Sequence, residues 1–172
     1  MSDKIYNVLF LCTGNSARSI LGEALMNKMG EGHFRAYSAG SQPKGEVHPM
    51  SLEVLQSFGY PTEGLYSKNW NEFTRPGAPE FDFIFTVCDN AAGESCPVWP
   101  GKPLTAHWGV EDPAAVEGDG QRQAFIDALS YLKRRIELFL MLPLKSIDEM
   151  ALRSKLAAIG REEGASAKAK EA

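Results

Sequence analysis

Apolar residues follow two different spacings along this chain, and the two spacings alternate. Nearly continuous apolar runs are typical of strands buried on both faces of a parallel sheet, and such strand candidates lie at residues 8–11, 34–38, 83–87 and 102–107. Apolar residues that recur every three or four positions indicate helices packed on a core, and they do so at residues 17–25, 49–58 and 125–142.

This alternation predicts an α/β fold in which a four-stranded parallel sheet carries helices on both faces. The length of 172 residues fits one compact domain with an appendage. We place the domain at residues 1–142, because Pro143 interrupts the last long helix. Residues 143–172 then form a helical extension. We expect a helix at 146–159 and a frayed or disordered tail at 160–172, which is rich in Gly, Ala, Lys and Glu.

The charge of the chain excludes two classes of partner. Lysine and arginine total 18 against 22 aspartates and glutamates, a net charge of −4. No basic cluster suits a nucleic acid or an anionic membrane. The start of the chain lacks the apolar stretch of a signal peptide, and no run reaches the length of a membrane span. We therefore expect a cytoplasmic protein that binds neither nucleic acid nor membrane.

The first strand runs directly into a loop that suits a tetrahedral oxyanion. Backbone N–H groups in a strand-to-helix loop can converge on one anion, and Gly14 and Asn15 tolerate the left-handed backbone that such a cradle needs. Arg18 supplies a planar charged fork for two oxygens. The same positive environment predicts that Cys12 is a thiolate nucleophile, with Ser19 donating to it. The predicted oxyanion site consists of Thr13, Gly14, Asn15, Ser16, Ala17, Arg18 and Ser19.

The chain has three cysteines, and all of them fall in loops at one predicted edge of the sheet. Cys12 and Cys88 each follow a strand, and Cys96 lies in the next loop. The carboxyl ends of parallel strands meet at the edge where ligands bind. An odd number of cysteines argues against a structural disulfide framework. The plain alternative is that Cys88 is a core residue and Cys96 a surface thiol.

The loop and several later motifs resemble one superfamily. Residues 8–19 resemble the loop of the low-molecular-weight protein tyrosine phosphatases, and more specifically that of the arsenate reductases built on the same fold. The similarity spans roughly residues 5–142 and continues through residues 37–40, 85–88, 96–97, 107–109 and 112–114.

The resemblance implies a relay of three thiols that reduces arsenate to arsenite. Cys12 attacks arsenate, Cys88 attacks the Cys12 sulfur as arsenite leaves, and Cys96 attacks Cys88 to free Cys12. Each exchange is ordinary thiol–disulfide chemistry. The relay uses no bound cofactor but needs an external thiol reductant: thioredoxin is our first choice, and glutaredoxin with glutathione the second. Phosphate is expected to compete with arsenate.

A carboxyl group must protonate the oxygen that leaves the substrate. By resemblance this acid is Asp112, with Glu111 as the substitute candidate, although an aspartate before proline is also a common turn or helix cap. Related phosphatases carry aromatic residues after this motif, whereas this chain has Ala114 and Ala115. A small oxyanion therefore fits better than phosphotyrosine.

Two other functions stay open from the sequence. One is a tyrosine phosphatase that uses Cys12, Arg18 and Asp112. The other is a non-catalytic module that binds anions or senses redox state. Some relatives also bind potassium beside the loop through four residues, of which Asn15, Glu23 and Ser38 match three. The fourth position is Lys68, so we expect its ammonium in place of the ion, and no metal site.

Overall fold

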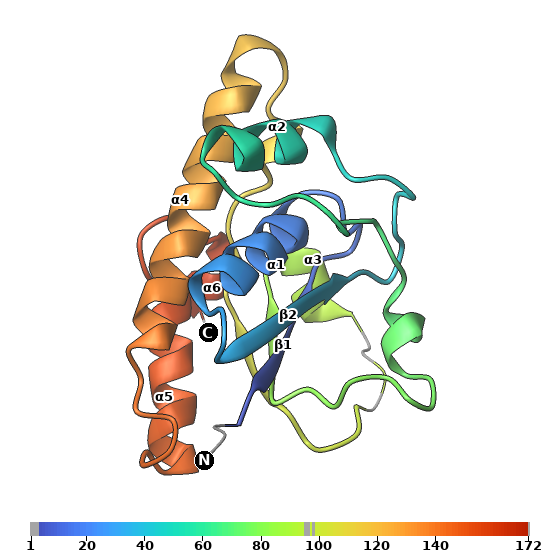
Figure 1. The fold of residues 1–172 in the computed structure, drawn as a ribbon. Coiled ribbons are helices and arrows are strands. Elements are labelled where there is room, and N and C mark those ends of the chain that lie inside the picture. Colours follow the sequence, from blue (N-terminus) through green and yellow to red (C-terminus); the bar gives the residue numbers. More distant parts are fainter. Residues whose placement is uncertain (1–3, 95–96, 98, 172) are drawn as a thin grey trace.

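The computed structural model describes residues 4–94, 97 and 99–171. Over these residues, four parallel strands form one sheet in the order β2-β1-β3-β4 (Figure 1). The strands are β1 (Tyr6–Leu11), β2 (Phe34–Ala39), β3 (Phe83–Thr86) and β4 (Leu104–His107). The predicted fold class is confirmed. In the sheet register Leu11 pairs with both Ala39 and Thr86, so the segments that follow β1 and β3 leave the sheet side by side.

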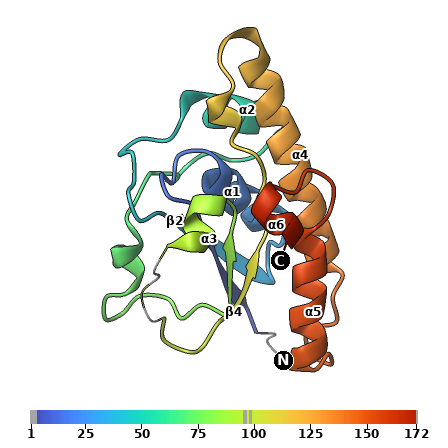
Figure 2. The ribbon, with the colours of Figure 1, turned by 180° about the vertical axis from the view of Figure 1, so that it is seen from behind.

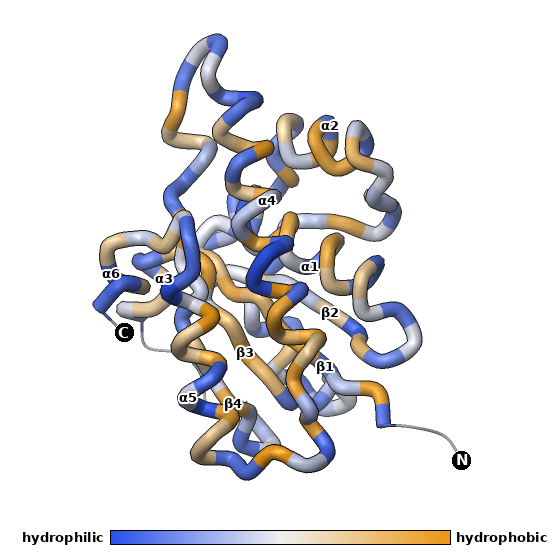
Figure 3. Tube along the Cα trace, turned by 90° about the vertical axis from the view of Figure 1, so that its left-hand side faces the viewer, coloured by the Kyte–Doolittle hydropathy of each residue, from blue (hydrophilic) through white to orange (hydrophobic). Residues whose placement is uncertain are grey.

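Alternating side chains of β1 serve two cores. Val8 and Phe10 belong to the larger core, and Leu9 and Leu11 to the smaller one, as the twofold period of a strand requires. The hydropathy of the trace shows the apolar strands β1 and β3 in the middle of the molecule (Figure 3). Both faces of this strand are therefore buried, which accounts for its unbroken apolar run.

Helices pack around the larger core, and the smaller core is closed by less regular structure. The long helices of the larger core are α1 (Arg18–Met29), α2 (Pro49–Ser57), α4 (Gln121–Leu140) and α5 (Glu149–Gly160). The smaller core is covered by aromatic residues of the 3₁₀ helix η1 (Trp70–Phe73) and of the loop after it. Two further 3₁₀ turns, η2 (Pro113–Ala115) and η3 (Gly118–Gly120), lead into α4.

The C-terminal tail differs from its prediction. Residues 160–171 are not frayed: they end in the helix α6 (Ala167–Glu171), with Ala165, Ser166 and Ala169 buried. The buried guanidinium of Arg135 fixes the segment that precedes this helix, because it donates to the backbone carbonyls of Glu162 and Glu163 at 3.0 and 3.1 Å. Such long-range contacts leave no trace in a composition of small and charged residues.

The tail lies against α3 (Asp89–Gly93), a short helix that the sequence did not predict. Figure 2 shows α6 and α3 next to each other at the end of the sheet where β3 and β4 finish. Leu156 of α5 accepts, through its backbone carbonyl, a hydrogen bond from the indole of Trp108 at 3.0 Å. The extension is thus packed on the same body as the predicted domain.

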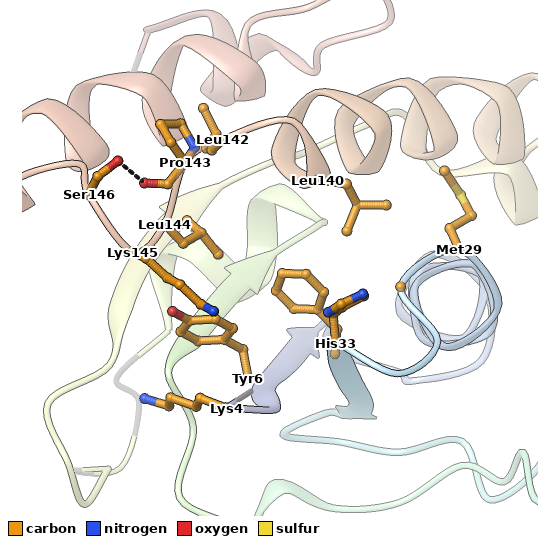
Figure 4. Close-up of a pocket in the computed structure, with 12 residues that line it drawn as sticks. Lys4, Tyr6, Met29, His33, Leu140, Leu142, Pro143, Leu144, Lys145 and Ser146 are labelled. Atoms are coloured by element: carbon orange, nitrogen blue, oxygen red, sulfur yellow. Dashed lines mark hydrogen bonds between the residues drawn. The ribbon is translucent and has the colours of Figure 1, made fainter. Parts of the chain in front are cut away.

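One apolar pocket lies at the opposite end of the sheet from Cys12 and Cys88. It has a volume of about 490 Å³ and lies between the start of β1, the end of α1 and the segment that follows α4 (Figure 4). Tyr6, Met29, His33 and Leu144 are among its lining residues. None of the predicted site residues that the structure describes lines it. Within the described part of the chain, no helix is long and apolar enough to cross a membrane.

Candidate active site

The loop between β1 and α1 turns its carbonyl groups outward. Three of its carbonyl oxygens accept hydrogen bonds from the backbone of an outer loop: Thr13 from Gln42, Gly14 from Lys44, and Ser16 from His48, each at 3.0 Å. In a trans peptide the next N–H points away from the carbonyl. The N–H groups that follow these carbonyls therefore point inward, toward a pocket of about 560 Å³ that Cys12 and Arg18 line. This arrangement has the geometry that the predicted oxyanion cradle requires.

The sequence predicted a left-handed backbone at both Asn15 and Gly14, and the structure has it at Asn15 alone. Asn15 adopts the predicted left-handed backbone, with φ 43°, but Gly14 does not. A side chain at Gly14 would instead meet Lys44. The tighter contact is at Gly40, where an added Cβ would lie 2.3 Å from the Thr13 carbonyl oxygen and 2.4 Å from that of Cys12. Gly40 is therefore required for the close approach of the two loops.

Arg18 is oriented by the loop that carries Asp112. Its Nη1 donates to the backbone carbonyl of Val110 at 2.8 Å, and its Nη2 lies 3.8 Å from Asp112 Oδ2. Its buried Nε has no hydrogen-bond acceptor among the described residues. A buried guanidinium nitrogen that is left unpaired is costly. An oxyanion in the cradle would supply the missing acceptor.

Cys12 and Cys88 lie together in this pocket. Both described cysteines are buried, and neither is in a disulfide. The Cys12 thiol donates to Cys88, which raises the pKa of Cys12, and burial raises it further. The same bond lowers the pKa of Cys88 to about 5, with help from the backbone N–H groups of Thr13 and Ala91, each 3.4 Å from its sulfur. These directions favour the thiolate on Cys88 in the free protein, and that Cys12 is the thiolate nucleophile stays a prediction.

The position of Asp112 is compatible with both roles that the sequence left as alternatives. One carboxylate oxygen accepts from the backbone N–H of Ala114 at 3.0 Å and so caps η2, while the side chain as a whole lines the pocket beside Cys12. The side chain is 42% exposed, so it can exchange protons with water. Ala114 also lines the pocket, and Glu111 does not. The geometry favours Asp112 over Glu111 as the acid.

Lys68 occupies the position predicted for it beneath the loop. Its ammonium lies 3.6 Å from Glu23 Oε1 and 3.5 Å from the Ser38 hydroxyl. Asn15 closes the cluster, because its amide nitrogen donates to Ser38 and its oxygen accepts from the backbone N–H of Lys68. Asn15 also donates to the Ser19 hydroxyl at 2.8 Å. That Ser19 donates to Cys12 stays a prediction.

The sequence analysis missed two acidic residues, Asp89 and Glu94, at the two ends of the helix that follows Cys88. Asp89 follows Cys88 and lies 2.7 Å from His107 Nε2. At the other end of α3, the Glu94 carboxylate accepts from the hydroxyls of Thr13 and Ser41. An aspartate at the start of a helix directly after a cysteine was the available signal, since acidic residues favour that position. The partners are distant in sequence and left no signal.

The structure therefore brings together four of the five predicted catalytic residues: Cys12, Arg18, Cys88 and Asp112 all line one pocket. The fifth, Cys96, lies outside the described residues. Thr13, Gly14, Ser16 and Ala17 line the same pocket. Asn15 and Ser19 are fully buried and hydrogen-bond to each other beneath the loop.

Comparisons with known proteins agree on the family. The arsenate reductase of Halalkalibacterium halodurans is 31% identical over 134 residues, which is 77% of this chain and 93% of the relative. A solved arsenate reductase in its phosphate-binding state is 26% identical, with a TM-score of 0.65 over 79% of this chain and 97% of that one. The thioredoxin-dependent arsenate reductase of Corynebacterium glutamicum is 24% identical, with a TM-score of 0.59 over 85% and 66%. Because the family model for low molecular weight phosphotyrosine protein phosphatase matches residues 7–152, the chain belongs to that family.

Proposed function

We propose that this protein reduces arsenate to arsenite through a relay of Cys12, Cys88 and Cys96. The observation that carries the proposal is that Cys12 and Cys88 line one pocket beside the oxyanion loop, where the interaction between the two thiols shifts the pKa of each. A phosphatase needs one nucleophile, whereas a second thiol in contact with the first makes a redox step possible. The curated relative named above is an arsenate reductase.

The first step joins sulfur to arsenic. Arsenate binds in the cradle with its oxygens on the loop N–H groups and on Arg18. The Cys12 sulfur then forms a bond to arsenic as one As–O bond breaks. Asp112 protonates the oxygen that departs as water, and the Cys12 proton passes to the thiolate of Cys88, its hydrogen-bond partner. General acid catalysis of this kind contributes about 10²–10⁴-fold in rate.

The second step transfers the electrons. Cys88 passes the proton that it took from Cys12 to an oxygen of the arsenic adduct and attacks the Cys12 sulfur, so that an S–S bond forms and the S–As bond breaks. The electron pair of the broken bond stays on arsenic, which leaves as arsenite. Arsenic gains two electrons, and the two sulfurs together lose two. The backbone N–H groups of Thr13 and Ala91 favour the attacking thiolate, because both donate to the Cys88 sulfur.

The third step moves the disulfide away from the oxyanion loop. Cys96 attacks Cys88, which releases Cys12 and leaves a Cys88–Cys96 disulfide. Helix α3 rises about 1.5 Å per residue and so carries the chain away from Cys88, whereas a disulfide requires Cα atoms within about 7 Å. We infer that α3 unwinds in this step and that the disulfide becomes open to an external dithiol. Thioredoxin is our first choice for that dithiol, ahead of glutaredoxin with glutathione.

Phosphatase activity is the second candidate, supported by the family and by the cradle itself. Against phosphotyrosine as the main substrate stands Ala114, which lines the pocket at the position where related phosphatases carry an aromatic residue. A small bare oxyanion needs no such platform. We expect weak hydrolysis of a phosphotyrosine analogue that depends on Cys12 and is indifferent to Cys88 and Cys96.

An assay of arsenate-dependent NADPH oxidation with thioredoxin and thioredoxin reductase tests the relay. We expect Cys12→Ser, Cys88→Ser and Cys96→Ser each to abolish multiple turnover, while Ser154→Ala, an exposed serine on α5, turns over normally. Normal turnover by Cys88→Ser or Cys96→Ser would sink the relay. If those two variants also hydrolyse a phosphotyrosine analogue efficiently, the phosphatase assignment is correct instead.

A further inference from the structure

The C-terminal tail is fastened to the segment that follows Cys88. The backbone of Ala165 pairs with that of Val110 in an isolated antiparallel bridge, and the N–H of Ser166 donates to the carbonyl of Gly109 at 2.9 Å. Ser166 is 3% exposed, and Ala169 of α6 is fully buried. Helices α6 and α3 lie in contact (Figure 2). Residues 165–171 therefore pack against the helix that begins at Asp89.

Asp89 is where the tail and α3 are joined. The Ser166 hydroxyl donates to Asp89 Oδ1 at 2.5 Å, and the backbone N–H of Lys168 donates to Oδ2 at 3.3 Å. His107, at the end of β4, contacts the same Oδ1 at 2.7 Å. Burial acts to raise the pKa of Asp89, but the hydrogen bonds from Ser166 and His107 outweigh it and lower the pKa below its ordinary value. The charged carboxylate of Asp89 thus links α3 to the C-terminal tail and to β4.

Helix α3 depends on such anchors because it is too short to be stable alone. It has five residues, and isolated helices of fewer than about 12 residues are marginal in water. Its second anchor is Glu94, which binds Thr13 and Ser41 at the far end. The two ends of α3 are therefore clasped, the first by the tail and β4, the second by the oxyanion loop.

We propose that residues 165–171 form a strap that keeps α3 wound while Cys88 and Cys96 are reduced, with Ser166 as its positioning residue. This inference rests on the proposed function, in which α3 unwinds for Cys96 to reach Cys88. The strap stabilises the dithiol form relative to the disulfide form. It therefore makes the Cys88–Cys96 couple more oxidising, because a couple whose reduced form is stabilised accepts electrons more readily.

Hydrogen exchange tests the strap without reference to arsenate. We expect Ser166→Ala, and a chain that ends at Gly164, to raise the exchange rate of the α3 amides of Ala92 and Glu94 about tenfold. Ending the chain at Gly164 leaves the carbonyls that Arg135 uses in place. Ser166→Thr keeps the hydroxyl and restores protection, and Ser154→Ala serves as the matched control. Unchanged exchange in both test variants overturns the strap.

Redox titration tests its consequence for the relay. In the Cys12→Ser variant, oxidised dithiothreitol takes two electrons and two protons from Cys88 and Cys96 as their disulfide forms. Loss of the strap should favour the disulfide about tenfold, a shift of about 30 mV to more negative potential for a two-electron couple. Equal potentials with and without Ser166→Ala overturn the strap and leave the relay intact. If no Cys88–Cys96 disulfide forms even with the strap present, the proposed function fails, and the strap's redox role fails with it.

Discussion

The ammonium of Lys68 lies 3.6 Å from the carboxylate of Glu23, and the two side chains are 5% and 13% exposed. Burial raises the pKa of Glu23 and lowers that of Lys68, and in each case it outweighs the attraction of the opposite charge. The cost of removing the two charges from water is therefore comparable with the gain from their attraction. The backbone N–H of Lys68 donates to Asn15 of the oxyanion loop, so the ion pair supports the position of that loop.

Removal of Lys68 should weaken the fold and expose a latent cation site. Lys68→Ala leaves Glu23 buried without its partner, and breaking a buried ion pair costs about 3–5 kcal/mol. We expect potassium to restore part of the melting temperature of this variant when sodium does not, while the original protein is indifferent to the choice of salt. The double variant Lys68→Ala with Glu23→Gln should show no potassium response. A potassium effect on the original protein would contradict the assignment of Lys68 to the ion's place.

The Lys68 cluster also shows which features of the site could be predicted from the sequence. The pattern of apolar runs predicted the four strands, and the residue types of the loop predicted the cradle, because strand period and loop chemistry are local properties. Lys68 was placed through a resemblance. The lowered pKa of Cys88 was not predictable, since the Cys12 thiol and then the N–H groups of Thr13 and Ala91 meet Cys88 only in the folded chain. Ser166 reaches Asp89 across 77 positions, and no local pattern reports such a contact.

The thiolate of Cys88 should titrate near pH 5. Its pKa is lowered from 9.0 to about 5, first by the hydrogen bond from Cys12. In a Cys96→Ser background, ultraviolet absorbance of the thiolate should rise with a midpoint at about pH 5. Adding Cys12→Ala should move the midpoint up toward the ordinary value. A midpoint that stays unchanged would show that Cys12 is not the cause of the shift.

The lowered pKa of Cys88 should make the folded state more stable as the pH rises. The unfolded state binds the Cys88 proton up to about pH 9 and the folded state only up to about pH 5. The contribution of Cys88 is therefore complete above pH 9, falls as the pH falls through this window, and is lost below pH 5. The raised pKa of Cys12 acts in the opposite direction above pH 9. Denaturant unfolding of Cys88→Ser against its parent, repeated across the window, should show a difference that grows with pH.

Gly40→Ala should disrupt the cradle with every catalytic side chain intact. The added Cβ would lie 2.3 Å from the carbonyl oxygen of Thr13, a contact that only a backbone movement can relieve. We expect a loss of about 1–3 kcal/mol in stability, as for other overpacked sites, and phosphate binding weakened at least about tenfold by calorimetry. Gly120→Ala is the matched control, because its Cβ would meet its nearest atom at 3.4 Å. Equal phosphate affinity in the two variants would show that the loop tolerates the shift.

Asp112→Asn separates the two roles of this side chain. An asparagine can still accept the hydrogen bond that Asp112 takes from the backbone N–H of Ala114, so η2 and the melting temperature should be unchanged. It cannot donate a proton to the oxygen that leaves arsenic. We therefore expect the rate of Cys12–arsenic bond formation in a single turnover to fall about 10²–10⁴-fold, with phosphate affinity retained. Glu111→Gln, one residue away and outside the pocket, should leave the rate unaltered. If the two variants lose activity equally, the acid is not Asp112 and the carboxylate serves the turn alone.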